Sequence, residues 1–324
     1  MAVSFMRLGV GLAVAGLAIG GLIGAARAES PQSPGTWAMK APMPTARAEM
    51  AAAVVGGKLY AIGGNIGGTA VPHNTEYDPA TDSWRQRNPM PVARDHIGIA
   101  AVNGKIYTFG GFTHTVHQGA STDVFEYDPV TDAWRRRAPL KMPLGGVGAT
   151  VLDGKIHVIA GRGPDGKTVD MHAVYDPAAD SWSEAAPLPL ARDHLAIVAA
   201  EGKIHAIGGR LGATVDKTGQ HDVYDPATNS WSSAAPMLTP RSAAAGVLYH
   251  GLILTLGGEL APNTYVENEG YDLKTGKWVA LAPMPAGRHN FGSGVIGPSA
   301  YFVGGSLKPG VGEPTGQLIV FTLP

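Results

Sequence analysis

The chain has 324 residues, with 25 basic and 26 acidic side chains and a formal net charge of −1 at pH 7. This balance argues against nucleic acid as a partner, because phosphate binding needs a net basic surface or a basic stripe. The absence of cysteine excludes disulfide bonds and a lipoprotein anchor. Stability must therefore come from apolar burial and from backbone pairing.

The N-terminus is predicted to be a secretory signal peptide, residues 1–28. Arg7 is followed by an uncharged stretch rich in Gly, Ala and Leu, and Ala26-Arg27-Ala28 supplies the small-x-small pattern of a cleavage site. The alternative is an uncleaved membrane anchor, since the apolar stretch is nearly long enough to span a bilayer. We predict a periplasmic or secreted protein with no membrane contact after signal removal, whose mature part, residues 29–324, is one domain.

Tryptophan marks an internal repeat. All six tryptophans recur about every 48 residues, a period typical of propeller blades; they are Trp37, Trp84, Trp134, Trp182, Trp231 and Trp278. Glycine pairs follow the same period, with Ala160-Gly161 as the one imperfect copy. Six repeats are therefore visible.

Each repeat contains signals for four short strands. In the first repeat an apolar run breaks at Gly56-Gly57 and resumes, which is a hairpin signature. Asp78-Pro79 ends a third strand, because proline lacks a backbone donor, and Trp84 lies in a fourth. Four such strands cannot bury both faces alone, so neighbouring units must stack.

We therefore predict an all-β, six-bladed propeller with four antiparallel strands per blade. The N-terminal strand is expected to close the last blade, because residues 36–38 form an orphan fourth strand and the last repeat ends with a third strand at 317–322. This pairing removes two exposed strand edges. The expected blades are residues 47–88, 96–138, 147–186, 195–235, 243–282, and 290–322 with 36–41.

The repeat resembles the kelch family throughout residues 36–324. The resemblance rests on an apolar run, a glycine pair, Tyr and Trp at fixed offsets, and a Met-Pro-x-x-Arg segment between units. It implies a kelch propeller in which the loops after the glycine pairs and the loops leading into the next blade lie on one face. The bacterial N-acetylneuraminate epimerases, which are exported kelch propellers acting on an anionic sugar, are a more distant resemblance.

Arginines occupy five of the loops that lead into a blade: Arg47, Arg94, Arg192, Arg241 and Arg288. In the third repeat Gly145-Gly146 stand where the arginine is expected. One interpretation is structural, since this arginine belongs to the kelch consensus and its five donors suit backbone carbonyls. More distinctive is Arg-Asp-His, which occurs at Arg94-Asp95-His96 and Arg192-Asp193-His194 and flanks the exceptional repeat.

A ligand site is predicted around this gap, in the sector of the third and fourth repeats. Its expected binding residues are Arg94, Asp95, Gly146, Arg162, Arg192, Asp193 and Arg210, with His96 and His194 as candidate catalytic residues. Clustered arginines bind carboxylate or sulfate bidentately, so the expected partner is an anionic small molecule, glycan or peptide. Pairing between Arg and Asp would cancel part of that charge. The alternative sector lies around Glu49, Glu259 and His289.

Two function classes remain open. The first is a binding or interaction protein that uses one loop face of the propeller to bind an anionic ligand, either an acidic sugar or an acidic peptide. The second is a sugar-modifying enzyme of the N-acetylneuraminate epimerase (mutarotase) type, with His96 or His194 as general acid or base. A copper radical oxidase like galactose oxidase is disfavoured, because its cofactor needs a cysteine.

The remaining histidines give no diagnostic ligand pattern. His114 and His117 lie in a long loop without a Cys or carboxylate at metal-binding spacing, so no metal and no cofactor are predicted. His157 and His205 stand where sister repeats have Tyr60 and Tyr107, and we expect them in the core.

Overall fold

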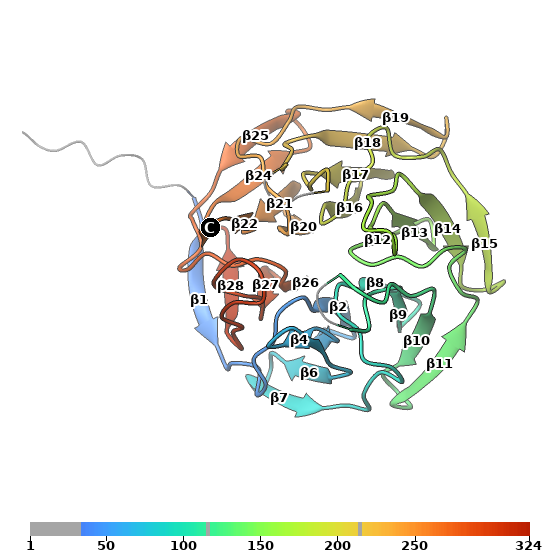
Figure 1. Ribbon diagram of the computed structural model, residues 1–324. Coiled ribbons are helices and arrows are strands. Elements are labelled where there is room, and N and C mark those ends of the chain that lie inside the picture. Colours follow the sequence, from blue (N-terminus) through green and yellow to red (C-terminus); the bar gives the residue numbers. More distant parts are fainter. Residues whose placement is uncertain (1–33, 115–116, 213–215) are drawn as a thin grey trace, which may run out of the picture. The chain divides into compact units, whose positions relative to one another are not determined.

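The computed structural model describes residues 34–114, 117–212 and 216–324, which form six blades arranged in a ring (Figure 1). The predicted signal peptide lies outside these residues. Every blade is a four-stranded antiparallel sheet, and the secondary structure of the described residues is entirely β, so the predicted fold class is confirmed. Within the described part of the chain there is no helix of the length and apolarity needed to cross a membrane.

The innermost strand of each blade lines the axis, and these strands consist mainly of small residues because six of them converge there (Figure 1). A Cβ on Gly148 would lie 2.1 Å from Cγ1 of Ile197 in the next blade, and one on Gly292 would lie 2.5 Å from Cβ of Ala52. The innermost strands are β2 (Ala51–Val55), β8 (Gly98–Val102), β12 (Gly148–Leu152), β16 (Ala196–Ala200), β20 (Ala245–Tyr249) and β26 (Gly292–Ile296).

The second and third strands supply most of the buried core, which is divided among clusters that lie between neighbouring blades. The second strands are β3 (Lys58–Ile62), β9 (Lys105–Phe109), β13 (Lys155–Ile159), β17 (Lys203–Ile207), β21 (Leu252–Leu256) and β27 (Ser299–Val303). The third strands are β6 (Asn74–Asp78), β10 (Val124–Asp128), β14 (His172–Asp176), β18 (His221–Asp225), β24 (Asn268–Asp272) and β28 (Leu318–Thr322).

The fourth strands form the rim and carry the tryptophans, each of which links two blades. The indole Nε1 of Trp134 donates to the carbonyl of Asn88 at 2.8 Å, and that of Trp278 donates to the carbonyl of Ala235 at 2.7 Å. All six tryptophans make the equivalent bond. The fourth strands are β7 (Ser83–Gln86), β11 (Ala133–Arg137), β15 (Ser181–Glu184), β19 (Ser230–Ser233), β25 (Lys277–Ala280) and β1 (Thr36–Lys40).

Two histidine pairs lie in the core, as expected for His157 and His205. Nδ1 of His157 lies 2.8 Å from Nε2 of His172, and Nδ1 of His205 lies 2.8 Å from Nε2 of His221. His172 and His221 in turn contact backbone carbonyls through Nδ1. Burial is the main reason why the pKa of each of the four falls to about 4, so these pairs are neutral structural elements at pH 7.

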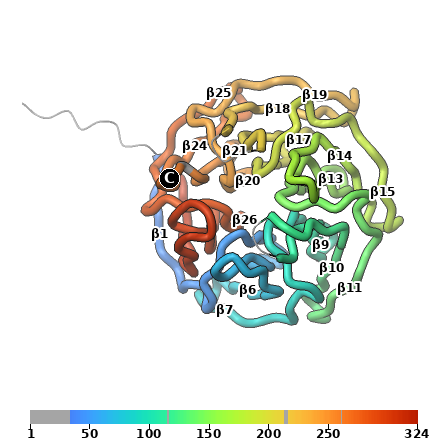
Figure 2. Tube along the Cα trace, in the orientation of Figure 1, coloured from blue at the N-terminus to red at the C-terminus, as the bar shows by residue number. Residues whose placement is uncertain are grey.

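The sixth blade is closed by the N-terminal strand, which confirms the predicted scheme. β1 pairs antiparallel with β28 in a register that runs from Thr36 opposite Thr322 to Lys40 opposite Leu318. In the tube view the two ends of the described chain run side by side at one point of the ring (Figure 2). Two short hairpins, β4 (Asn65–Ile66) with β5 (Thr69–Ala70) and β22 (Glu259–Leu260) with β23 (Asn263–Thr264), extend the loops after glycine pairs.

Deleting residues 29–41 should therefore expose the edge of β28 and cause aggregation, because an unpaired strand edge is a template for pairing with other chains. Light scattering and thermal melting will measure the effect. The control, a chain that lacks only residues 1–28, should stay monomeric and melt cooperatively. A soluble, cooperatively melting deletion variant would contradict the closure scheme.

Candidate functional site

Six equivalent residues surround the axis at one end of the inner strands, and we call them the axial ring. Each precedes an innermost strand by two positions and lies in a loop between blades; they are Glu49, His96, Gly146, His194, Ala243 and Asn290. All six have a left-handed backbone, with φ between 47° and 63°. This conformation is uncommon for residues other than glycine, and its recurrence in every blade makes it a feature of the repeat.

Backbone hydrogen bonds connect the axial ring across the blades. The N–H of His96 donates to the carbonyl of Glu49 at 2.9 Å, and the N–H of Gly146 donates to that of His96 at 2.8 Å. Equivalent bonds join Ala243 to His194, Asn290 to Ala243, and Glu49 to Asn290. The left-handed turns direct the backbone N–H and carbonyl groups along the ring. The side chains of the ring residues therefore point toward the axis.

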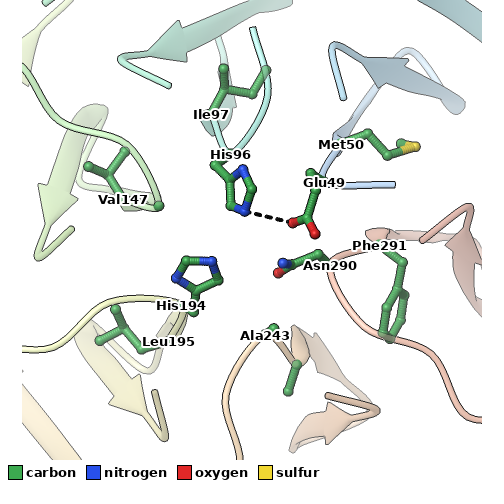
Figure 3. Close-up of a pocket in the computed structure, with 12 residues that line it drawn as sticks. Glu49, Met50, His96, Ile97, Val147, His194, Leu195, Ala243, Asn290 and Phe291 are labelled. Atoms are coloured by element: carbon green, nitrogen blue, oxygen red, sulfur yellow. Dashed lines mark ion pairs between the residues drawn. The ribbon is translucent and has the colours of Figure 1, made fainter. Parts of the chain in front are cut away.

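The axial ring and the residues that follow it enclose a pocket of about 110 Å³ (Figure 3). The close-up shows His96, His194, Glu49 and Asn290 directed toward a common centre. Below them the walls are apolar and include Ile97, Val147, Leu195 and Phe291. The pocket therefore has a polar mouth on an apolar base, and the polar groups come from blades 1, 2, 4 and 6.

One side of the mouth is formed by carboxylates that alternate with histidines. Nε2 of His96 lies 2.8 Å from Oε2 of Glu49, and its Nδ1 lies 2.9 Å from Oδ1 of Asp95. Nε2 of His289 lies 3.5 Å from Oε1 of Glu49 and 3.2 Å from Oε1 of Glu259. All of these side chains are buried, so the charges must be balanced within the group.

The protonation of these residues follows from their contacts. Burial lowers the pKa of His96, but the carboxylates of Glu49 and Asp95 outweigh it and raise the pKa to about 10. Burial likewise lowers the pKa of His289, and contact with Glu49 and the charge of Glu259 raise it above the usual value. Burial raises the pKa of Glu49, but His96 and His289 hold that pKa well below its usual range. His96 is thus an imidazolium at neutral pH.

The other side of the mouth is organised by Asp193. Its Oδ1 accepts from Nε of Arg210 at 2.8 Å and lies 2.7 Å from Nδ1 of His194, and its Oδ2 accepts from Nε of Arg162 at 2.7 Å. Arg210 also donates through Nη1 to Glu259 at 3.1 Å. Burial, and then the charge of Arg210, lower the pKa of His194, so this histidine is neutral where His96 is charged.

His117 joins this group from the loop after a glycine pair in blade 2. Its Nε2 and that of His194 both lie 3.1 Å from Nη2 of Arg210. Its ring centroid is 4.8 Å from that of His96 and 5.3 Å from that of His194. Burial, followed by the charges of neighbouring histidines and Arg210, lowers the pKa of His117 far below its usual value.

Comparison with protein families identifies the type of repeat. Residues 37–188 match the family model described as the "KLHDC2/KLHL20/DRC7 Kelch-repeats domain". Residues 37–188 are therefore kelch repeats. The same strands and tryptophans continue past residue 188 to the C-terminus, so the fold is a six-bladed kelch propeller.

Solved structures share this fold. One described as "Structure of YjhT" is similar with a TM-score of 0.73 and 17% sequence identity, covering 87% of this chain and 96% of that one. At this identity the likeness shows the fold alone. A search among curated proteins found no match to the sequence.

Two of the predicted ligand arginines belong to the blades of the kelch propeller and do not line the pocket. Arg192 donates to the carbonyls of Gly208 and Ala206 and forms an ion pair with Asp222 at 2.8 Å. Arg94 pairs with Asp123 in its own blade. Both are buried like the other consensus arginines. We therefore assign Arg94 and Arg192 the structural role that the kelch resemblance implies.

The alignment of the third repeat also needs correction. Leu144, not Gly145-Gly146, occupies the arginine position, because Gly145 pairs with Arg162 as Asp95 pairs with Phe112 and Asp193 with Arg210. The two glycines thus replace the Asp-His of blades 2 and 4. A Cβ on Gly146 would lie 3.2 Å from the ring of His194, so glycine leaves room for that side chain.

The structure does bring together Asp95, Asp193, Arg162, Arg210 and the two Arg-Asp-His histidines. Glu49, Glu259 and His289 do not form a separate sector, since Glu49 contacts His96 and Glu259 contacts Arg210. The sequence signal for Glu49 was its alignment with His96. No local signal identified His117, because it reaches the axis through a long loop.

Proposed function

We propose that the protein is an exported binding module that holds an anionic ligand, an acidic sugar or an acidic peptide, at the axial pocket. The polar residues of the pocket stand at positions where the propeller does not need them. Blade 5 has Ser242 and Ala243 where blades 2 and 4 have Asp-His, and blade 3 has two glycines. Buried charges that the fold does not require are characteristic of functional sites.

The observation that carries the proposal is the convergence of Arg162 and Arg210 on Asp193 beside the pocket. In this sector two guanidinium groups share one carboxylate, and Glu259, the second partner of Arg210, is shared with His289. Arg162 keeps 12% of its side chain exposed. A ligand carboxylate would add the second anion, which a guanidinium can bind through two parallel hydrogen bonds.

Replacing Arg162 with Gln should weaken ligand binding at least about tenfold, equivalent to roughly 1.4 kcal/mol, because one charged donor is lost. Thermal shift will first identify the ligand among N-acetylneuraminate, glucuronate and an Asp/Glu-rich peptide, since a ligand of the native state raises the melting temperature. Calorimetry will then compare affinities. The control is Arg136→Gln, because Arg136 pairs with Asp123 and its side chain is 64% exposed. Equal affinity in Arg162→Gln and wild type, or no shift with any of the three ligands, would contradict the proposal.

A second candidate function is sugar mutarotation, favoured by the two histidines at the mouth. The ring centroids of His96 and His194 lie 5.0 Å apart, and their surroundings move their pKa values in opposite directions. Two neighbouring groups held in different protonation states can act as general acid and general base. Ring opening of a sugar needs that pair, with protonated His96 as the acid and neutral His194 as the base.

If this second function holds, added protein should accelerate the anomer exchange of N-acetylneuraminate, measured by NMR. His194→Gln keeps a polar side chain but cannot take up a proton, so the acceleration should fall at least about a hundredfold, the usual range for a general base. Binding without acceleration by wild-type protein would leave the protein a binding module.

A further inference from the structure

Three histidines from two non-adjacent blades meet at the mouth of the pocket. One ring nitrogen from each of His96, His117 and His194 lies within 4.8 Å of the other two. His96 and His117 come from blade 2 and His194 comes from blade 4, while blade 3 between them contributes only Gly146 to the ring. The missing side chain of blade 3 lets the two flanking histidines approach each other.

A carboxylate on the Nδ1 side fixes the ring orientation of two of these histidines. Nδ1 of His96 faces Oδ1 of Asp95 at 2.9 Å, and Nδ1 of His194 faces Oδ1 of Asp193 at 2.7 Å. In both cases the carboxylate belongs to the preceding residue, so the Asp-His dipeptide is a repeated unit. A carboxylate on one imidazole nitrogen sets the tautomer and presents the other nitrogen, which is the arrangement found behind metal-binding histidines.

Contacts with Arg210 show that two of the presented nitrogens carry lone pairs. A guanidinium group only donates hydrogen bonds, and Nη2 of Arg210 lies 3.1 Å from Nε2 of both His117 and His194. These nitrogens therefore act as acceptors. An unprotonated imidazole nitrogen is the form that binds a metal ion, so His96, which is charged in the metal-free protein, must release one proton when the ion binds.

An oxygen donor lies beside the three nitrogens. Oε2 of Glu49 is 2.8 Å from Nε2 of His96, and among the described residues this buried atom has no hydrogen-bond partner of good geometry. The side chain lines the pocket (Figure 3). Glu49 thus offers a carboxylate oxygen where a fourth ligand would be needed.

The core histidine pairs provide an internal comparison. His157 and His205 each contact another histidine directly at 2.8 Å, which is how imidazoles satisfy one another in this fold. In the described structure His96, His117 and His194 make no such mutual bond, and their nitrogens are held at wider separation. That separation fits a group placed between them better than a direct contact.

We propose that His96, His117 and His194 bind a divalent transition-metal ion of the zinc type, with Glu49 as the adjacent oxygen ligand. Imidazole suits Zn²⁺ and its neighbours in the series, and three histidines with one oxygen form a tetrahedral set. Bonds of about 2.0–2.1 Å place ligand atoms roughly 3.4 Å apart, so modest side-chain rotations close the site. The ion adds positive charge beside Arg210, which would serve an acidic ligand, but its binding does not depend on the proposed function.

The test uses untagged protein and metal ions alone, so that neither an affinity tag nor a ligand contributes. Calorimetry with Zn²⁺ after chelator treatment should give one equivalent bound, and Co²⁺ should show the visible absorption of a tetrahedral site. His117→Ala should lower Zn²⁺ affinity by more than the roughly 10–100-fold that outer-shell changes cost. Asp95→Asn should lower it within that range.

The matched control is His114→Ala, which removes a histidine from the same loop whose Nδ1 contacts Thr113 instead. It should leave the affinity and the Co²⁺ spectrum unchanged. The melting temperature without metal will show that each variant is folded. No stoichiometric Zn²⁺ binding, equal affinity in His117→Ala and wild type, or equal losses in His114→Ala and His117→Ala would each overturn the assignment. None of these outcomes bears on whether an anionic ligand binds to Arg162.

Discussion

Convergence of six inner strands on one axis is the constraint on which the rest of this structure depends. Glycine, alanine and valine make up most of these strands, and a Cβ on Gly148 would lie 2.1 Å from Cγ1 of Ile197 in the next blade. The walls of the axis therefore carry little chemistry. The charged and polar side chains of the pocket lie where the strands begin, in the left-handed turns of the axial ring.

Charge balance is the second consequence of this geometry. Side chains presented at the axial ring are buried, so each charge needs a partner within the mouth of the pocket. Glu49, Asp95, Asp193 and Glu259 supply negative charge, and His96, His289, Arg162 and Arg210 are their positive partners. This network joins charged side chains from all six blades, whereas the tryptophan bonds and the consensus arginines hold the blades themselves together.

The fold could be predicted from the sequence because each repeat carries the same local signals for strands and turns. Tryptophan spacing, glycine pairs and the orphan strand at residues 36–38 are local signals that agree with one another. The site was predicted less completely. Arg94 and Arg192 follow a pattern that stabilises the blades. In the third repeat Leu144 replaces the arginine, so the sequence alignment there was shifted by one residue. His117 reaches the axis through tertiary contacts of a long loop, which no spacing in the sequence encodes.

The central claim is that the polar network at the axial ring serves a ligand and not the fold. Urea unfolding of metal-free protein tests it most directly, using a triple variant that gives blades 1 and 2 the small residues of blade 5: Glu49→Ala, Asp95→Ser and His96→Ala. Its free energy of unfolding should lie within about 1 kcal/mol of wild type, because the triple variant removes His96 together with both of its carboxylate partners, while His289 keeps Glu259. The single variant His96→Ala should lose about 3–5 kcal/mol, since it leaves the buried carboxylate of Asp95 without its cationic partner and leaves Glu49 with His289 alone. A triple variant less stable than the single variant would show that the network is needed for folding and would contradict the account.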